Sequence, residues 1–462
     1  MRTGRILALA SLSLASAALA FACVDDSTDT PSGLAVDGGS LPDGSQSSDA
    51  STSRQDAEGV DVSQPDVSQP DAGPTDLDAP ADVATDAVSD AGADAPVEAA
   101  TEAGPDAAAA TGGPYLYFPT NVDNTILGYK LGGPDGGLAP IDMDPGTAGV
   151  QKLTVNRPST VAAHPSGKWL FNAAFGGSNI GAYAIDPATG VLTQRDVDVA
   201  TPGVQDFTLG AGYSGGYIAA DPKGRVLYFS DSNGNRLVTL SVDGATGALS
   251  VVSTVTLGIS VRAFAVDPKA GFLYMVSDAI NPGVVRIPLD PSTGIPTTGP
   301  LADGGFASLT LSGAGNCVEA VVSADGQLYT SCSQNQKIHA VGESADGGLT
   351  SLGSATVGVA PLAVTTHPNG KFAYSATFSA ADLHTYAIAP DAGPTAVGSA
   401  LTISASCRSF VFEPTANVLF AGCDGKIVAL LIDAVTGAPT LLGSVLAGTD
   451  SGYSMAIVTP PL

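Results

Sequence analysis

Basic residues are scarce in this 462-residue chain, which has 18 Lys and Arg against 45 Asp and Glu and a formal net charge of −27. Binding to nucleic-acid phosphates needs clustered Lys and Arg, so the composition excludes a nucleic-acid partner. After residue 23 there is no run of about 18 apolar residues, and we expect no membrane span there. No Cys-x-x-Cys or His-rich metal signature occurs, so we expect neither a metal nor another cofactor.

Aromatic residues are absent from positions 24–112, a segment with 17 Asp and 3 Glu against a single base, Arg54. Its net charge of −19 leaves only −10 for residues 113–462. A chain so rich in Asp, Ala, Ser and Pro buries too little apolar surface to offset the entropy lost on ordering. We therefore predict a disordered acidic tether over 23–112. Calcium binding by its Asp residues is a weaker interpretation, because the glycine and oxygen spacing of a calcium loop are missing.

The N-terminus has the pattern of a secretory signal peptide over residues 1–22. Arg2 and Arg5 precede an apolar run that ends in small residues at Ala20-Phe21-Ala22. Cys23 follows directly, as in a bacterial lipoprotein box, although that box prefers Leu where Ala20 stands. Ordinary cleavage that leaves a plain thiol is the alternative. Because the other four cysteines can form two disulfides, Cys23 is the unpaired cysteine, and acylation would remove its free thiol. We expect an exported protein of the cell envelope, outer membrane or cell surface, anchored by lipid, or else secreted.

Residues 113–462 form an internal repeat, in which two kinds of turn separate short apolar strands. Pro presets φ in these turns, Gly supplies positive φ, and Asp caps the bend. The first turn is built on Pro and Gly, at 162–171, 219–229, 265–275, 321–330, 365–375 and 411–421. The second is of the type Asp-x-x-Thr-Gly, at 185–192, 242–249, 289–296, 345–349 and 432–439. Four strands for each repeat unit are typical of a propeller blade.

The two ends of the repeat are incomplete in complementary ways. The segment 115–141 matches the second to fourth strands of a unit, and 453–460 matches only the first strand. Together they complete one blade, which closes the ring and leaves no exposed sheet edge. We therefore predict an all-β fold, a seven-bladed β-propeller with four-stranded blades closed by the C-terminal strand, and a monomer.

The turns and blade count resemble the lactonase family of seven-bladed β-propellers, which is similar to bacterial 6-phosphogluconolactonase and to cycloisomerases of muconate-type acids. The resemblance implies a lactone hydrolase. In that family the Arg and His of a Gly-Pro-Arg-His run, at the start of an inner strand, are implicated in the site. The nearest runs here are Cys407-Arg408-Ser409 and Val261-Arg262-Ala263, which keep Arg and lack His.

A site is expected on the loop face, which carries the second-to-third loops and the connections between blades, including long ones at 141–159, 195–216 and 297–317. The Pro-Gly and Thr-Gly turns occupy the opposite turn face. Innermost strands begin at the loop face, so their first residues should ring the channel mouth. The candidate ligand-binding residues there are Arg157, Tyr217, Arg262, Glu319, Arg408 and Ser409, with Thr160, Leu362, Tyr453 and Ser454 at matching positions.

Converging Arg residues suit a small carboxylate or phosphate ligand, since guanidinium binds such anions in a fork. Pairing of these Arg residues with nearby loop acids at a solvated rim is the alternative. The four histidines recur at repeat positions, His164 and His367 in turns and His339 and His384 in third strands, and are interpreted as structural.

Four cysteines occupy matching positions of two blades. Cys317 and Cys407 lie seven residues before the first turn, while Cys332 and Cys423 end the second strand. The two cysteines of each blade face each other across one hairpin, which predicts the disulfides Cys317–Cys332 and Cys407–Cys423. Buried free thiols are the alternative.

Two functions remain open, besides the simpler interpretation of a purely structural surface protein. The missing His and the export signal favour a lipid-anchored module that binds a small anion, a glycan or a protein through its long-loop face. The second is a lactone hydrolase acting on a sugar lactone or related acid, with Arg262, Glu319 and Arg408 as substrate and acid-base groups.

Overall fold

The computed structural model describes residues 112–461 except 133–135, 145, 148, 150, 199–202, 204, 232, 258, 278–282, 298–305, 404, 414–416 and 449–451. The predicted signal peptide, Cys23 and all but the last residue of the predicted tether lie outside the described residues. The described part contains strands and no helix, and hence no helix long and apolar enough to cross a membrane.

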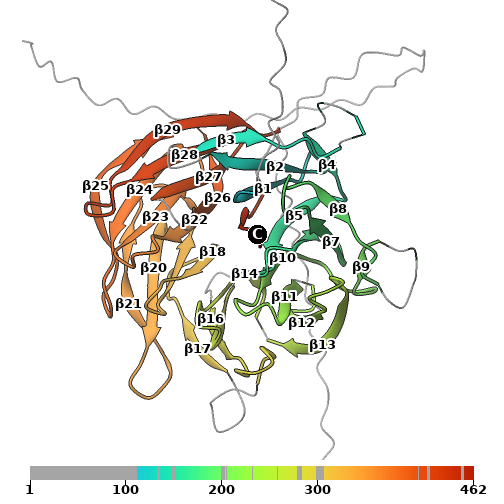
Figure 1. The fold of residues 1–462 in the computed structure, drawn as a ribbon. Coiled ribbons are helices and arrows are strands. Elements are labelled where there is room, and N and C mark those ends of the chain that lie inside the picture. The colour runs from blue at the N-terminus through green and yellow to red at the C-terminus, as the bar shows by residue number, and fades with distance from the viewer. Residues whose placement is uncertain are drawn as a thin grey trace, which may run out of the picture. The chain divides into compact units, whose positions relative to one another are not determined.

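Seven antiparallel sheets are arranged in a ring, with the first strand of each nearest the centre (Figure 1). Blades are numbered from the first complete one. Blades 1 to 3 contain β5 (Pro158–Ala163), β6 (Trp169–Ala174), β7 (Asn179–Ile185), β8 (Leu192–Gln194) and β9 (Phe207–Thr208); β10 (Gly215–Ala220), β11 (Val226–Asp231), β12 (Arg236–Val242) and β13 (Leu249–Thr256); and β14 (Val261–Val266), β15 (Phe272–Ser277), β16 (Gly283–Pro288) and β17 (Ala307–Thr310).

The remaining blades follow the same order from the centre outwards. Blades 4 to 6 contain β18 (Cys317–Val322), β19 (Leu328–Cys332), β20 (Lys337–Glu343) and β21 (Leu349–Thr356); β22 (Pro361–Thr366), β23 (Phe372–Thr377), β24 (Asp382–Ala387) and β25 (Thr395–Thr402); and β26 (Cys407–Phe412), β27 (Val418–Cys423), β28 (Lys426–Ile432) and β29 (Pro439–Leu446). Blade 7 contains β30 (Ala456–Val458), β1 (Tyr115–Thr120), β2 (Thr125–Gly132), β3 (Gly137–Pro140) and β4 (Lys152–Thr154).

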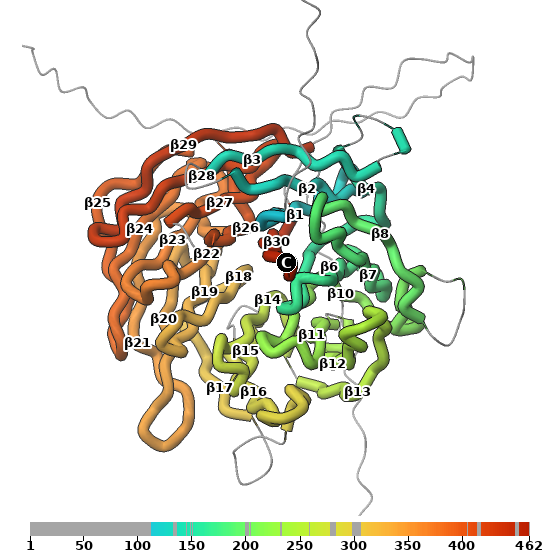
Figure 2. Tube along the Cα trace, in the orientation of Figure 1, coloured from blue at the N-terminus to red at the C-terminus, as the bar shows by residue number. Residues whose placement is uncertain are grey.

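The two ends of the propeller meet in blade 7, as predicted. β30 pairs antiparallel with β1, where Tyr115 lies opposite Val458 and Tyr117 opposite Ala456. Figure 2 shows the two strands side by side near the centre of the ring. The inner strand of the last blade thus comes from the C-terminus and its other strands from the start of the propeller. The predicted fold, blade number and closure are confirmed.

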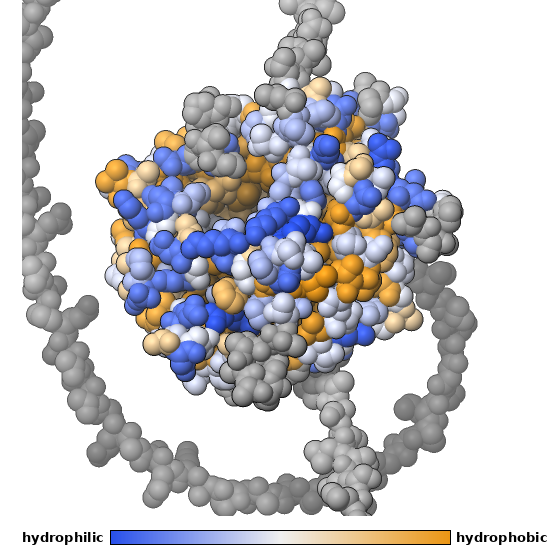
Figure 3. Space-filling model, turned by 60° about the horizontal axis from the view of Figure 1, so that its bottom comes forward, coloured by the Kyte–Doolittle hydropathy of each residue, from blue (hydrophilic) through white to orange (hydrophobic). Residues whose placement is uncertain are grey.

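The hydrophobic core is divided among the interfaces between blades. Buried apolar residues form one cluster at each of the seven interfaces. At the closing interface Tyr115 and Tyr117 of blade 7 pack with Leu170 of blade 1. Outside this core, the visible surface shows hydrophobic residues in several separate patches among hydrophilic ones (Figure 3).

Tyrosines of second strands link each of three blades to the next through the Thr-Gly turn. The hydroxyl of Tyr374 in blade 5 donates to the carbonyl of Gly437 in blade 6 at 3.0 Å. Tyr117 bonds Gly190 at 2.7 Å and Tyr228 bonds Gly294 at 2.6 Å in the same manner. Gly437 has a φ of 74°, and a Cβ there would lie 2.4 Å from the ring of Phe372, so the turn needs glycine for two reasons.

Asp433 holds this turn from within. Its Oδ1 accepts the backbone N–H groups of Val435 and Thr436, each at 2.8 Å. The same geometry occurs at Asp186, Asp243 and Asp290. The repeat turns therefore serve the packing of blades as well as the reversal of the chain.

Two of the three long connections, 141–159 and 195–216, differ from their expected place on the loop face. β3 pairs with Tyr129–Gly132 of β2, and after the insertion β4 pairs with Thr125–Leu127 of the same strand. In the same way, β8 pairs with one end of β7 and, after the insertion, β9 pairs with the other end. These two insertions therefore interrupt the outermost strand and leave from the outer edge of the ring. Connection lengths along the sequence do not reveal that the strand resumes after the insertion.

Replacing Tyr374 by Phe tests the turn contact between blades. We expect the free energy of unfolding to fall by about 1–3 kcal/mol, because the variant leaves a buried carbonyl of Gly437 without its donor. Urea denaturation measures the change. Tyr386→Phe is the matched control, since that buried hydroxyl has no hydrogen-bond partner among the described residues and its loss should cost little. Equal losses for both variants would contradict the assignment.

Candidate active site at the channel mouth

A β-bulge recurs at the loop-face end of the inner strand in blades 1 to 6. In each of these strands the pairing register slips by one residue. Bulges bend a strand and redirect the extra side chain. The extra residues are Ser159, Gly216, Arg262, Val318, Leu362 and Arg408. The bulge thus sets two predicted arginines, Arg262 and Arg408, at equivalent points around the mouth.

A cavity of about 280 Å³ lies at the mouth beside blades 1 to 3. Of the predicted ligand-binding residues Tyr217 and Arg262 line it, and the others, Arg157, Glu319, Arg408 and Ser409, do not. Arg262 and Tyr217 interact electrostatically across the interface between blades 2 and 3. Burial raises the pKa of Tyr217, which also interacts electrostatically with Arg262, Glu319 and Tyr453. The lining residues are Ser159, Phe175, Gly176, Ser214, Gly215, Gly216, Tyr217, Ser230, Val261, Arg262 and Tyr453.

Tyr453, just before β30, brings together groups from several blades. Its backbone N–H donates to the carbonyl of Ser159 in blade 1 at 2.9 Å. Its ring stacks on Phe175 with centroids 6.0 Å apart, and it lies 6.2 Å from the ring of Tyr217. The guanidinium of Arg408 in blade 6 lies 5.9 Å from the same ring. The closing segment of the chain therefore places an aromatic surface between the arginines of the mouth.

The other arginines of the rim also lie over aromatic rings. Arg157 is 5.3 Å from the centroid of Phe175, and Arg408 is 5.8 Å from that of Phe378. Arg408 additionally pairs with Asp424 at 3.7 Å, so the solvated-rim interpretation holds for that contact. Such cation–π contacts orient a guanidinium while its N–H groups remain able to bind an anion.

Glu319 is the one acidic residue among the predicted ligand-binding residues. It follows the bulge in blade 4, where its backbone carbonyl accepts the hydroxyl of Thr330 at 2.7 Å. Burial raises the pKa of its carboxyl from 4.5 to about 8, against a smaller lowering by the N–H of Ala320. A carboxyl that titrates near 8 can exchange a proton at physiological pH, which is the task otherwise assigned to His.

Ser409 lies apart from the other predicted residues. It is only 4% exposed, and a Cβ on Gly422 would lie 2.4 Å from its Oγ, close also to Phe118 and Met455. The side chain thus faces the interface between blades 6 and 7. Leu362 forms a bulge in blade 5, and Ser454 binds the backbone of Val161.

Two exposed aromatic residues at the mouth are not among the residues predicted from the sequence. Phe175 and Phe378 directly follow the second strands of blades 1 and 5 and are 40% and 48% exposed. Asp424 holds the equivalent position in blade 6, where its N–H bonds to the residue before Cys407. Aromatic residues in place of polar ones at this repeat position were the available signal.

Both predicted disulfides are present, Cys317–Cys332 and Cys407–Cys423. Each joins the register pair immediately before a bulge. One therefore fixes the start of β18 two residues before Glu319, and the other the start of β26 next to Arg408. The pairing suits an oxidising, extracytoplasmic compartment.

Three of the four histidines bond to neighbouring groups of turns or loops. His164 binds the carbonyl of Gly224 at 2.8 Å in the turn of the next blade, and His367 caps its own turn through Asn369. His339 bonds Asn335 at 2.9 Å, and burial lowers its pKa to about 4. Among the described residues no cluster of His, Cys, Asp or Glu could hold a metal ion.

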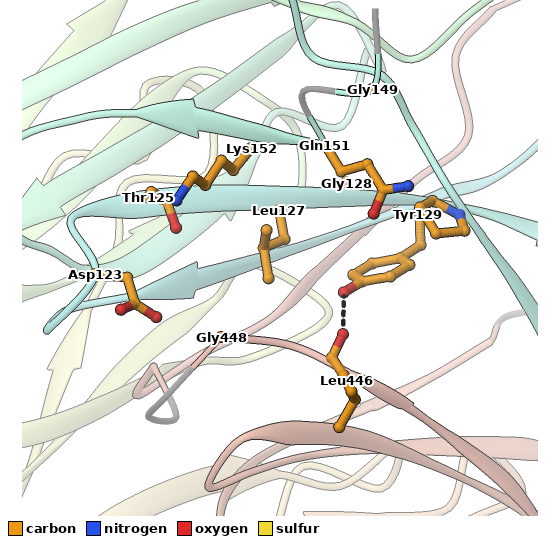
Figure 4. A pocket seen from close by; sticks show the side chains of 11 residues that line it. Asp123, Thr125, Leu127, Gly128, Tyr129, Gly149, Gln151, Lys152, Leu446 and Gly448 are labelled. Carbon is orange, nitrogen blue, oxygen red and sulfur yellow. Dashed lines mark hydrogen bonds between the residues drawn. The ribbon is translucent and has the colours of Figure 1, made fainter.

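A larger cavity of about 600 Å³ lies between blades 6 and 7. Tyr129 spans it and donates to the carbonyl of Leu446 at 3.0 Å, while Asp123 and Lys152 lie along its walls (Figure 4). It contains none of the sequence-predicted residues. We therefore place the candidate active site at the channel mouth, around the smaller cavity that Tyr217 and Arg262 line.

Comparison with known proteins supports the resemblance that the turns predict. A family model described as lactonase, 7-bladed β-propeller, matches residues 200–298. No curated protein matches the chain in sequence. The family model therefore rests on blades 2 and 3, which contain Tyr217 and Arg262.

Solved structures share the fold at low identity. A candidate 6-phosphogluconolactonase from Bacteroides uniformis is 15% identical with a TM-score of 0.61, covering 75% of this chain and 99% of its own. A periplasmic gluconolactonase of Pseudomonas aeruginosa is 18% identical with a TM-score of 0.58, covering 75% and 100%. A protein from Lactobacillus plantarum is 15% identical with a TM-score of 0.59 and the same coverage. Such identities show a common fold and leave the activity open.

The raised pKa of Glu319 predicts a pH-dependent contribution to stability. Between pH 4.5 and about 8 the unfolded chain has lost this proton and the folded chain keeps it, so stability falls as pH rises. We expect Glu319→Gln to remove this part of the decline. The free energy of unfolding of the variant should therefore rise relative to that of the parent between pH 5 and pH 8. Urea denaturation at both pH values gives the difference. A difference independent of pH would contradict the raised pKa.

Removing one disulfide tests its role as a brace. We expect Cys407→Ala with Cys423→Ala to lower the free energy of unfolding by about 3 kcal/mol, since the bond closes a loop of roughly 16 residues. Cys23→Ala is the control and should leave the melting temperature unchanged. Mass spectrometry of a non-reduced digest checks the pairing, and thiols found free or crossed between blades would refute it.

Proposed function

We propose that the protein is a lactone hydrolase that acts on a sugar lactone or a related acid at the channel mouth. The proposal rests on Glu319, whose carboxyl has a pKa that burial raises to about 8, and on its electrostatic interaction with Tyr217, which lines the mouth cavity together with Arg262. The match of residues 200–298 to the lactonase family model supports the same reaction class. This interpretation is better supported than the binding module that the sequence favoured, because the interrupted strands of blades 7 and 1 send their insertions to the outer edge.

The reaction requires a proton acceptor and a stabiliser of negative charge. Water attacks the lactone carbonyl and gives its proton to ionised Glu319; the ring C–O bond then breaks, and the proton passes to the departing alkoxide to give a hydroxy acid. Arg262 stabilises the oxyanion and then the carboxylate, since its guanidinium donates to oxygen anions in a fork. The reaction is neutral in redox terms and needs no cofactor.

Substrate binding falls to the aromatic and basic side chains of the rim. The stacked rings of Phe175 and Tyr453 offer a flat apolar surface to one face of a sugar ring. Arg157 lies over the ring of Phe175 and Arg408 over that of Tyr453, and both guanidinium groups suit a carboxylate or phosphate substituent. In this arrangement Glu319 takes the proton-transfer role of the His that the Arg408-Ser409 run lacks.

We also propose that the enzyme works outside the cytoplasm on a membrane anchor. The two disulfides support export. Acylation of Cys23 would anchor the chain, and the acidic segment that follows would hold the propeller away from the bilayer.

Hydrolysis of glucono-δ-lactone by the purified full chain tests the proposal. We expect kcat/KM above the spontaneous rate, rising with pH to a plateau above about 8, and falling by about 10²–10⁴-fold in Glu319→Gln. Lys223→Ala, on the turn face, is the control and should retain full activity. Circular dichroism verifies that each variant is folded. Activity no higher than the spontaneous reaction across a panel of sugar lactones, or undiminished in folded Glu319→Gln, would overturn the mechanism.

A further inference from the structure

A separate cavity of about 330 Å³ lies between blades 7 and 1 and has a different chemical character from the mouth. It shares no lining residue with the mouth cavity. Its walls combine several carboxamides, a tyrosine and one carboxylate, and none of the described lining residues is Lys or Arg. The lining residues are Thr154, Val155, Asn156, Asn172, Ala174, Asn179, Gly181, Tyr183, Gln194 and Asp206. We call it the 7/1 cleft.

The 7/1 cleft exists because blade 1 departs from the repeat at one cross-strand pair. Asn172 of β6 lies opposite Gly181 of β7. A Cβ at Gly181 would lie 2.3 Å from Oδ1 of Asn172 and 2.7 Å from the hydroxyl of Tyr183. The cleft therefore depends on the missing side chain. In the other blades this pair is Phe118–Leu127, Phe229–Val238, Met275–Val285, Thr330–His339, Ser375–His384 and Ala421–Val428.

The interrupted outer strand of blade 1 forms the outer wall. β8 ends at Gln194 and β9 begins at Phe207, and the two appear as separate pieces at the edge of the ring (Figure 1). Gln194 and Asp206 flank the break, and the Gln194 amide donates to Asp206 at 3.0 Å. The insertion thus supplies a bonded pair of polar side chains where a continuous strand would have closed the cleft.

The polar groups of the cleft are held in fixed orientations. The hydroxyl of Tyr183 donates to Oδ1 of Asn172 at 3.0 Å, and Asn172 is only 3% exposed. Burial raises the pKa of Asp206, and burial together with the Asp206 charge raises the pKa of Tyr183. A carboxylate without a basic neighbour in the lining opposes an anionic ligand. Polar groups inside an otherwise apolar interface favour a ligand that hydrogen-bonds to them.

We propose that the 7/1 cleft binds a neutral sugar or polyol. Carboxamides present a donor and an acceptor side by side, and a carboxylate adds acceptors, which together match the adjacent hydroxyls of such a ligand. The volume lies at the lower end of the range for small-molecule sites and fits a single sugar ring. This site is independent of the hydrolase proposal and of the residues at the mouth.

Calorimetric titration of the purified full chain with glucose, galactose, mannose and sorbitol tests the site. We expect saturable binding of at least one of them. Asn172→Phe with Gly181→Val copies the Phe229–Val238 pair of blade 2, fills the cleft and should weaken binding by at least 10-fold. Gln194→Ala, at a partly exposed position, should weaken it without threatening the fold. Gln151→Ala in the cavity between blades 6 and 7 is the matched control and should bind as the parent does.

The outcomes separate this proposal from the hydrolase. Absence of binding by all four compounds, binding undiminished in both cleft variants, or binding of Ca²⁺ alone would overturn the site. Lactone hydrolysis should be unchanged in the cleft variants. Sugar binding in a chain without lactonase activity would refute the hydrolase alone, and lactonase activity without sugar binding would refute the cleft alone.

Discussion

Closure of the ring by β30 and β1 is the constraint on which the rest of the structure depends. Each blade buries its apolar faces only against its two neighbours, so an open ring would expose two faces and two strand edges. Pairing of Tyr115–Tyr117 with Ala456–Val458 removes both. The same closure places Tyr453 at the mouth, because that residue lies three positions before the closing strand and is held by the carbonyl of Ser159. Fold stability and the candidate site are therefore linked through one short segment.

The inner strands position the chemistry by a repeated irregularity. The bulge at the loop-face end of six inner strands bends each strand and redirects the side chains there. Arg262 and Arg408 are the extra residues of two bulges. Tyr217, Glu319 and Ser409 each directly follow a bulge. The disulfides precede two of these bulges and hold the strands near Glu319 and Arg408. Rigid support of this kind limits the movement of groups that must meet a substrate.

Variation between blades accounts for the cavities. A repeat position that holds two apolar side chains in blade 2 holds Asn172 and Gly181 in blade 1, and the outer strand there is divided. The mouth and the 7/1 cleft consequently differ in chemistry, one with arginines and aromatic rings and the other with carboxamides. Two unlike sites on one ring are possible because each interface between blades tolerates substitutions that the next need not share.

The sequence by itself determined the blade number, the turns, the closure and the disulfide pairs. These follow from turn chemistry and from a repeat period that can be counted along the chain. It also brought Tyr217, Arg262, Glu319 and Arg408 to one region, because equivalent positions of a ring lie at one level. Only the tertiary structure decided the raised pKa of Glu319, the place of Phe175 and Phe378, the inward turn of Ser409 and the outer exit of the insertions. Burial and contacts across the channel depend on which residues of different blades meet, and no local pattern along one chain contains that information.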